Sequence, residues 1–202
     1  MNNIALALIL LSTTCSTTLA SPVPTATSQK ADVVSIQPVN HMTTPKISLS
    51  ITIPGTYTRI SVHTGEPIDI LSNEKDTSIC EFIPQGEMAA SRSEIITTQL
   101  IVGKSLTAKN MVDGLRKNLS LYCNGEVLSQ SVTELKSYQT SELAMVHMYN
   151  CKREVVYVRY FSGPYDCTGI QFAKVIKNDE NPADVAKELK TSVDRICSVI
   201  VG

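Results

Sequence analysis

The 202-residue sequence contains no tryptophan, only three histidines and few aromatic residues of any kind. A sugar-binding platform built from exposed tryptophan rings is therefore excluded. The formal net charge is −1, and Lys and Arg do not cluster along the chain. The electrostatic footprint of a protein that binds nucleic acid or an anionic membrane surface is missing as well.

Catalytic and cofactor-binding motifs are also absent. The sequence has no HExxH, GxSxG, GxGxxG, Walker or EF-hand pattern. A single SxxK match, at residues 72–75, falls in a polar loop instead of at a helix start. His41, His63 and His147 are far apart, and no local spacing gathers metal ligands around them. The sequence therefore indicates no catalytic residue, no metal site and no cofactor.

Long hydrophobic runs are equally scarce, and the clearest one lies at the N-terminus. Residues 4–11 are all apolar, which suits the core of a signal peptide and falls short of the ~20 residues that a membrane span needs. A small-x-small pattern ends at Ala20, so we predict cleavage between Ala20 and Ser21. The segment before the run carries no Lys or Arg, which departs from the usual pattern. We expect a secreted or periplasmic protein with no transmembrane segment after cleavage.

Cys15 offers an alternative, because bacterial lipoproteins are anchored through an N-terminal cysteine. Their signal requires Leu three residues before the cysteine and a small residue directly before it. This sequence has Ser12 and Thr14 at those positions. The mismatch favours soluble export, with lipid anchoring at Cys15 as the lesser alternative.

The composition changes twice after the expected signal peptide (residues 1–20). Residues 21–46 hold four prolines among Ser, Thr, Ala and Gln, and apart from Val33–Ile36 they offer little to bury. This composition predicts a flexible leader. Apolar and polar residues alternate from Ile47 onward, as in a half-buried strand. We therefore expect a single globular domain over residues 47–202.

Within this domain the patterns predict two helices and a series of strands. Thr107 caps a helix over about 107–122, and Asn181 followed by Pro182 starts a second one over about 182–200. Strands are expected at 47–53, 57–63, 66–71, 80–83, 94–102, 126–136, 140–149, 154–161 and 167–177.

The order of these elements predicts an α+β fold, in which an antiparallel β-sheet meander packs against the two helices and N-terminal β-hairpins precede it. Over residues 47–202 the element order resembles that of the PsbP/Mog1-like proteins. This resemblance implies a fold that hosts unrelated binding and assembly roles. It carries no catalytic residue over to this chain.

Five cysteines remain after the expected cleavage, and an odd number leaves at least one of them unpaired. Cys151 and Cys167 flank one strand, which separates them by ~25 Å, so they are not expected to pair. The meander brings Cys123 towards Cys151, and the last helix returns Cys197 towards Cys167. We predict disulfides Cys123–Cys151 and Cys167–Cys197, with Cys80 as a free thiol. Five reduced, buried cysteines are the alternative.

Four aromatic residues gather near one predicted strand: Tyr157, Tyr160, Phe161 and Tyr165. If they face away from the core, they form a candidate binding surface for a partner protein or a small ligand. The alternative, that they pack beneath the helices, is favoured because few other aromatic residues are available for the core.

These observations lead to one main hypothesis and two alternatives. The main hypothesis is an exported, non-enzymatic binding protein of unknown ligand, associated with secretion, the cell surface or a host. One alternative is a secreted hydrolase or thiol enzyme with a dispersed active site, in which Cys80 would work with His63 or His147. The other is a lipoprotein subunit of a cell-envelope machine.

Overall fold

A computed structural model describes residues 32–36, 47–65, 76–102, 106–135, 138–163 and 166–201. Several predicted features lie outside these ranges: the signal peptide with its cleavage site Ala20–Ser21, Cys15, His41, Tyr165 and the strand expected at 66–71.

Seven antiparallel strands form the principal sheet, in the order β3-β4-β5-β9-β8-β7-β6. Their bounds are β3 Tyr57–Gly65, β4 Asp76–Pro84, β5 Glu94–Val102, β6 Glu126–Leu135, β7 Tyr138–Tyr149, β8 Lys152–Ser162 and β9 Asp166–Val175. Strands β6 to β9 are the predicted meander, and β9 pairs with β5 to join it to the N-terminal hairpins.

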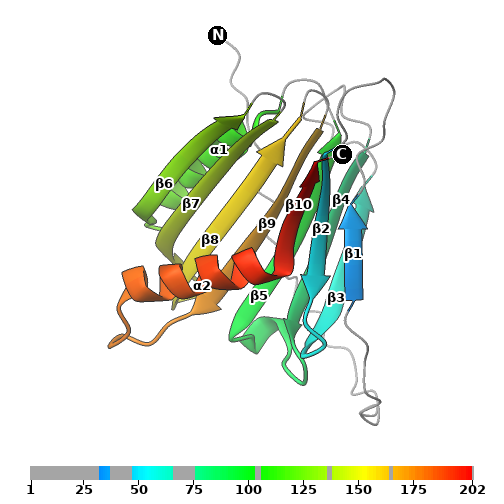
Figure 1. The fold of residues 1–202 in the computed structure, drawn as a ribbon. Coiled ribbons are helices and arrows are strands. Elements are labelled where there is room, and N and C mark those ends of the chain that lie inside the picture. The colour runs from blue at the N-terminus through cyan, green and yellow to red at the C-terminus, as the bar shows by residue number, and fades with distance from the viewer. Residues whose placement is uncertain are drawn as a thin grey trace.

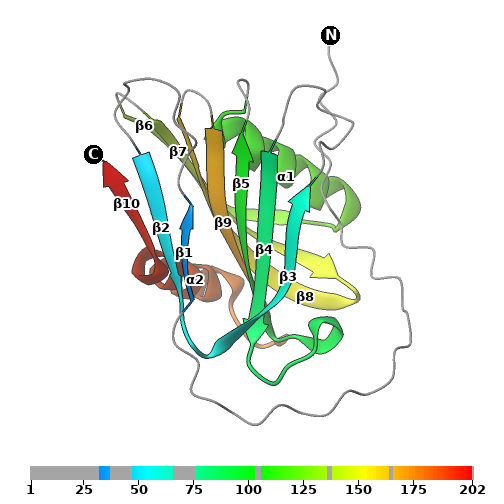
Figure 2. The same cartoon turned by 90° about the vertical axis from the view of Figure 1, so that its right-hand side faces the viewer.

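Two further layers cover the principal sheet. Helix α1 (Ala108–Tyr122) lies on one face. The other face carries helix α2 (Pro182–Ile196) and a small sheet of order β1-β2-β10, as Figure 1 and Figure 2 show. The strands of this small sheet are β1 Asp32–Ile36, β2 Ile47–Ile53 and β10 Cys197–Val201. The predicted α+β class, with helices packed on an antiparallel sheet, is confirmed.

Both helices begin where their capping residues predict. The Thr107 side chain accepts a hydrogen bond from the Asn110 N–H (3.1 Å), and the Asn181 side chain accepts one from the Ala183 N–H (3.0 Å). These bonds satisfy amides that have no partner within the helix. The apolar stripe of α1 is buried against the sheet: Met111, Val112, Leu115 and Leu119.

Strand β4 (Asp76–Pro84) is longer than the strand expected at 80–83. Two other segments adopt a different kind of structure from the one expected. The last helix ends at Ile196 instead of about residue 200, and Cys197–Val201 form β10, which pairs antiparallel with β2. The β-branched residues Val199, Ile200 and Val201 favour a strand when β2 is available for backbone pairing. Within the expected leader, Asp32–Ile36 form β1 on the other edge of β2. In both places pairing with a distant strand overrides the local pattern.

The core consists of two apolar clusters, one on each face of the principal sheet. We call them the α1-side and α2-side clusters. Strand β8 contributes side chains to both clusters, and every residue from Glu154 to Ser162 is buried. The Tyr160 ring lies against β9 at Gly169, where an added Cβ would sit 2.2 Å from a ring carbon. A residue without a side chain is therefore required beside Tyr160.

Candidate binding surface

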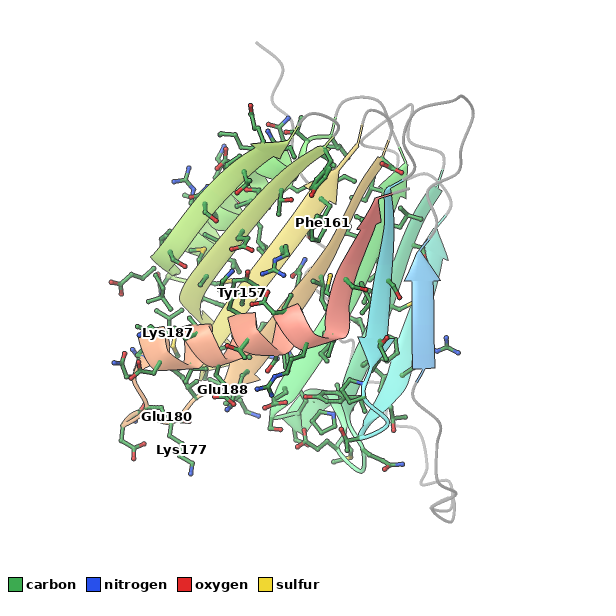
Figure 3. All side chains as sticks on the ribbon, in the orientation of Figure 1. Tyr157, Phe161, Lys177, Glu180, Lys187 and Glu188 are labelled. Atoms are coloured by element: carbon green, nitrogen blue, oxygen red, sulfur yellow. The ribbon has the colours of Figure 1, made fainter. Side chains whose placement is uncertain are left out.

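Three of the four aromatic residues predicted as a binding surface lie in the interior, and the fourth, Tyr165, is outside the described residues. Tyr157 and Tyr160 are each 2% exposed and Phe161 is 7% exposed. Tyr157 and Phe161 point towards the α2 side, where Figure 3 labels them, and Tyr160 belongs to the α1-side cluster. Period-two alternation sends these rings to both faces, and both faces of β8 are covered. The structure therefore places them in the core and not on an exposed surface.

No disulfide bond is present among the cysteines in the part of the chain that the structure describes. The Cys123 carbonyl accepts a hydrogen bond from the Met148 N–H (2.9 Å), so the end of α1 lies beside the end of β7. Asn150 and Cys151 form the two-residue turn that follows, with φ angles of 49° and 61°. The structure thus brings Cys123 close to the turn that carries Cys151, and a bond between them stays a prediction.

The structure does not bring Cys167 and Cys197 together. Cys167 is buried in the α1-side cluster, whereas Cys197 is buried in the α2-side cluster, where burial raises the pKa of its thiol to about 11. The predicted strand order placed both cysteines at the same end of the sheet, but it did not show that they lie on opposite faces. Cys80 packs on the α2-side cluster, whereas His147 lies on the α1 side of β7, so these two are not neighbours either. The side chain of His63 is outside the described part.

A charged network on the α2 side ties helix α2 to the sheet. The buried Arg159 of β8 donates from Nε to Glu142 Oε1 (2.7 Å) and from Nη2 to Asp194 Oδ1 (2.6 Å). It also donates to the Tyr157 hydroxyl (2.9 Å). Lys190 donates to Glu142 Oε2 (2.8 Å). Burial opposes ionisation of Glu142, but the Lys190 hydrogen bond and the Arg159 charge outweigh it and keep the Glu142 pKa below its usual value.

A second charged cluster lies on the α1 side, near the β7–β8 turn. His147 and Glu154 are cross-strand partners with 3.8 Å between Nε2 and Oε2, and Arg92 reaches Glu154 at 3.5 Å. The Arg92 guanidinium also stacks over the Tyr149 ring, 4.8 Å from its centroid. Burial lowers the pKa of His147 and raises that of Glu154. These longer contacts hold the β4–β5 connection against the meander more loosely than Arg159 holds α2.

Within the described ranges, no group of three or more His, Cys, Asp or Glu side chains is arranged to hold a metal ion. Neither helix described has the length and apolar character that would let it cross a membrane.

Exposed large apolar side chains concentrate where α1 leads into β6. Leu121 is 61% exposed, Tyr122 73%, Val127 41% and Val132 39%. We call these four residues the β6–α1 edge. Strand β6 is one of the two outermost strands of the principal sheet (Figure 1), and along Glu126–Glu134 every residue except the half-buried Leu128 is exposed. An uncovered strand with apolar side chains beside it is a candidate protein-binding surface.

The contacts of β6 define which groups point outward. Gln130 donates to Asp113 of α1 (2.9 Å), which places Gln130, and Val132 two residues on, towards the α1 side. The Ser131 carbonyl accepts a hydrogen bond from Ser141 of β7 (3.3 Å), so the backbone groups of Ser131 face β7. Because backbone direction alternates along an antiparallel strand, the N–H and C=O groups of Gln130, Val132 and Glu134 point away from the sheet.

Sequence reasoning placed a strand at 126–136 but did not recognise its edge position. The available signal was the lack of a continuous apolar face: between Ser129 and Glu134 only Val132 is apolar. A polar strand of this kind is typical of a sheet edge. The sequence pattern placed Tyr122 on the apolar stripe of the helix expected at 107–122, together with Met111, Val112, Leu115 and Leu119. The last four are buried, but Tyr122 is 73% exposed, because it lies at the end of the helix.

No family model matches the chain, and no curated protein matches it. Several solved structures are similar, among them two at low identity. Cyanobacterial PsbP (CyanoP) from Synechocystis sp. PCC 6803 is 14% identical, with 75% of this chain and 86% of that chain covered and a TM-score of 0.46. LpqN, involved in cell envelope biogenesis of Mycobacterium tuberculosis, is 10% identical, with 85% and 92% covered and a TM-score of 0.40. The resemblance predicted from the element order is confirmed as a weak, fold-level likeness that identifies no function.

Proposed function

We propose that this is an exported, non-enzymatic protein that acts by binding another protein through the β6–α1 edge. The observation that carries the proposal is the outer edge of β6, which pairs with no other described strand and has two exposed apolar side chains on β6 and two more at the end of α1. Apolar residues gathered on a surface commonly mark a contact site for another molecule. The N-terminal apolar run and the small-x-small pattern support export.

The charged clusters support a non-enzymatic role, because their side chains connect structural elements to one another. Arg159 is satisfied by two carboxylates and a hydroxyl, and it connects α2 with β8 and β7. Arg92 connects the β4–β5 connection with β8. A thiol enzyme built on Cys80 and His147 would need these side chains on one face of the sheet, whereas they lie on opposite faces.

Export also motivates a proposal for the cysteines. In an oxidising compartment Cys123 and Cys151 would join the end of α1 to the β7–β8 turn, close to the start of β6. Cys80 remains a thiol in this arrangement. Peptide mapping of the native protein without reduction is expected to recover a linked Cys123–Cys151 pair, and finding Cys123 unmodified in the oxidised protein would exclude the bond.

Export is tested by the intact mass of the protein isolated from its native source. We expect a mature chain that begins at Ser21. An acylated chain beginning at Cys15 would instead establish the lipoprotein alternative, and a chain retaining the first twenty residues would contradict export.

Binding is tested by photo-crosslinking in the native source. A photoreactive residue at Leu121 (61% exposed) is compared with one at Met88, which is 71% exposed on the β4–β5 connection. We expect a defined crosslinked partner from position 121 and none from position 88. Equal crosslinking at both positions, or none at either, would contradict a binding role for the β6–α1 edge.

A further inference from the structure

No described strand pairs with the outer side of β6, which presents a long row of backbone hydrogen-bonding groups. Native edge strands are commonly short, bulged, or carry Lys or Pro, which prevents another strand from pairing with them. Strand β6 is ten residues long and has neither Lys nor Pro. Its register irregularity lies near its start, between Val127 and Ser129. The stretch from Ser129 onward is therefore regular and open to an additional strand.

The side chains of β6 indicate what kind of strand would fit. On the α1 side, Val127 and Val132 offer apolar contacts. Two carboxylates, Glu126 and Glu134, stand near the two ends, and the strand contains no Lys, Arg or His. Opposite charges directly across a strand pair are favourable, and like charges are unfavourable. A complementary strand is thus apolar on one face and basic at its ends.

We propose that β6 accepts an extended, basic-ended segment of a partner protein as an additional outer strand. This inference rests on the proposed binding function and adds the mode of binding and the chemistry of the partner. The outward N–H and C=O groups of Gln130, Val132 and Glu134 supply the main-chain hydrogen bonds, as in other strand-addition complexes. Val127 and Val132 receive the apolar side chains of the segment, and Glu126 and Glu134 face its basic ends.

Charge argues against a second copy of this chain as the occupant. Pairing β6 with β6 of another copy brings four carboxylates and no cation to one strand pair. In a two-fold register centred on Gln130, Glu126 of each copy lies at the same end of the strand pair as Glu134 of the other, so two carboxylates gather at each end. A basic-ended segment neutralises these groups instead.

The proposal is tested with a synthetic, end-capped peptide of ten residues that alternates Val and Thr and has Lys at both ends. The full mature chain is titrated with it, and binding is followed by calorimetry. We expect saturable binding that weakens with added salt. The same peptide with N-methyl groups at every residue cannot donate main-chain hydrogen bonds from either edge, and we expect it not to bind. Equal binding of both peptides would overturn strand addition.

Three variants locate the contact on β6. Val132→Pro removes one outward N–H and leaves the pairing with β7 intact, as proline is tolerated on the outer side of an edge strand. We expect about a tenfold weaker peptide affinity. Val132→Thr keeps the N–H and loses only part of the apolar contact, so we expect a loss of less than about threefold, and the difference between the two variants measures the contribution of the N–H. Glu134→Lys is expected to weaken binding of the Lys-ended peptide by up to about fivefold and to favour a Glu-ended one. Unchanged affinity in Val132→Pro would overturn the site.

The crosslinked partner distinguishes this inference from the binding function on which it rests. If position 121 captures a partner and Val132→Pro leaves that capture unchanged, the protein binds without strand addition and only the inference falls. If no partner is captured at all, the proposed function falls as well. If the chain itself forms a dimer that Val132→Pro converts to a monomer, the occupant is a second copy and the basic-ended segment is excluded.

Discussion

Strands β8 and β6 have nearly the same length and opposite environments. In β8 every residue from Glu154 to Ser162 is buried, whereas β6 is exposed along almost its whole length. Both strands pair antiparallel with β7, one on each side of it. Position in the sheet order, and not local conformation, therefore decides which strand contributes stability and which one is free to bind.

The two strands handle polar groups differently as a result. On β8 the charged Arg159 is buried and must be surrounded by partners, because an uncompensated buried charge is costly. On β6 the carboxylates of Glu126 and Glu134 are hydrated and cost little. Four predictions test this difference, beginning in the interior of the sheet and ending at its edge.

The largest effect is expected where β8 packs on β9. Gly169→Ala places a Cβ into the Tyr160 ring, and the fully buried ring has little room to move. We expect a loss of about 3 kcal/mol in the free energy of unfolding, measured by urea denaturation. Gly163→Ala is the control, because its added Cβ meets the Asp166 carboxylate, a flexible group at the end of a side chain. Similar losses in both variants would show that the Tyr160 contact is not the cause.

Removing the charge of Arg159 is expected to cost about 2–3 kcal/mol. Arg159→Met leaves Glu142 and Asp194 without their shared cation, although Lys190 still pairs with Glu142 and Asp194 is half exposed. The value therefore lies at the low end for a broken buried pair. Arg116→Met, which removes an exposed partner of Asp113, is the control and should change stability by less than about 0.5 kcal/mol. Equal effects would mean that the Arg159 network contributes no more than a surface pair.

The cluster at the β7–β8 end predicts a pH dependence. Burial lowers the pKa of His147, so its contribution to stability is present above its unfolded value near 6.5 and is lost as the pH falls towards the folded value. The raised pKa of Glu154 acts with the opposite sign, because its burial cost is relieved as the pH falls. Arg92, Lys152, Tyr149 and Cys123 are the other titratable or charged groups nearby.

We expect unfolding free energy to decrease between pH 7 and pH 5.5, by less than the ~1.4 kcal/mol per pH unit that one proton allows. His147→Asn removes this decrease and leaves only the opposite trend from Glu154. Denaturant titrations at a series of pH values measure both. An unchanged pH profile in His147→Asn would rule out His147 as the source.

The smallest effect is expected on β6 itself. Val132→Thr places a hydroxyl in solvent and should change stability by less than about 0.5 kcal/mol. The same change on β8, Val158→Thr, buries a hydroxyl at a position that is 0% exposed and should cost about 2 kcal/mol. Thermal unfolding of the two variants compares edge and interior directly. A cost at Val132 as large as at Val158 would mean that β6 is covered.

Local signals located most elements. Strand β5 has the predicted bounds, and α1 begins one residue after the predicted cap, because capping and apolar periodicity depend on neighbours in the sequence. Local signals could not predict three other features: the burial of Tyr160 opposite Gly169, the separation of Cys167 from Cys197, and the exposure of β6. Each depends on which strand lies next to which, or on which face a side chain occupies.

By itself, therefore, the sequence determined the α+β class, the meander, both helix starts and the expectation of export. The tertiary structure decided that Tyr157, Tyr160 and Phe161 are core residues, that Cys197–Val201 is a strand and that β6 is left open at the edge. The physical reason is that propensity and capping act within a few residues, whereas burial and exposure arise only when distant strands pair and cover, or fail to cover, one another.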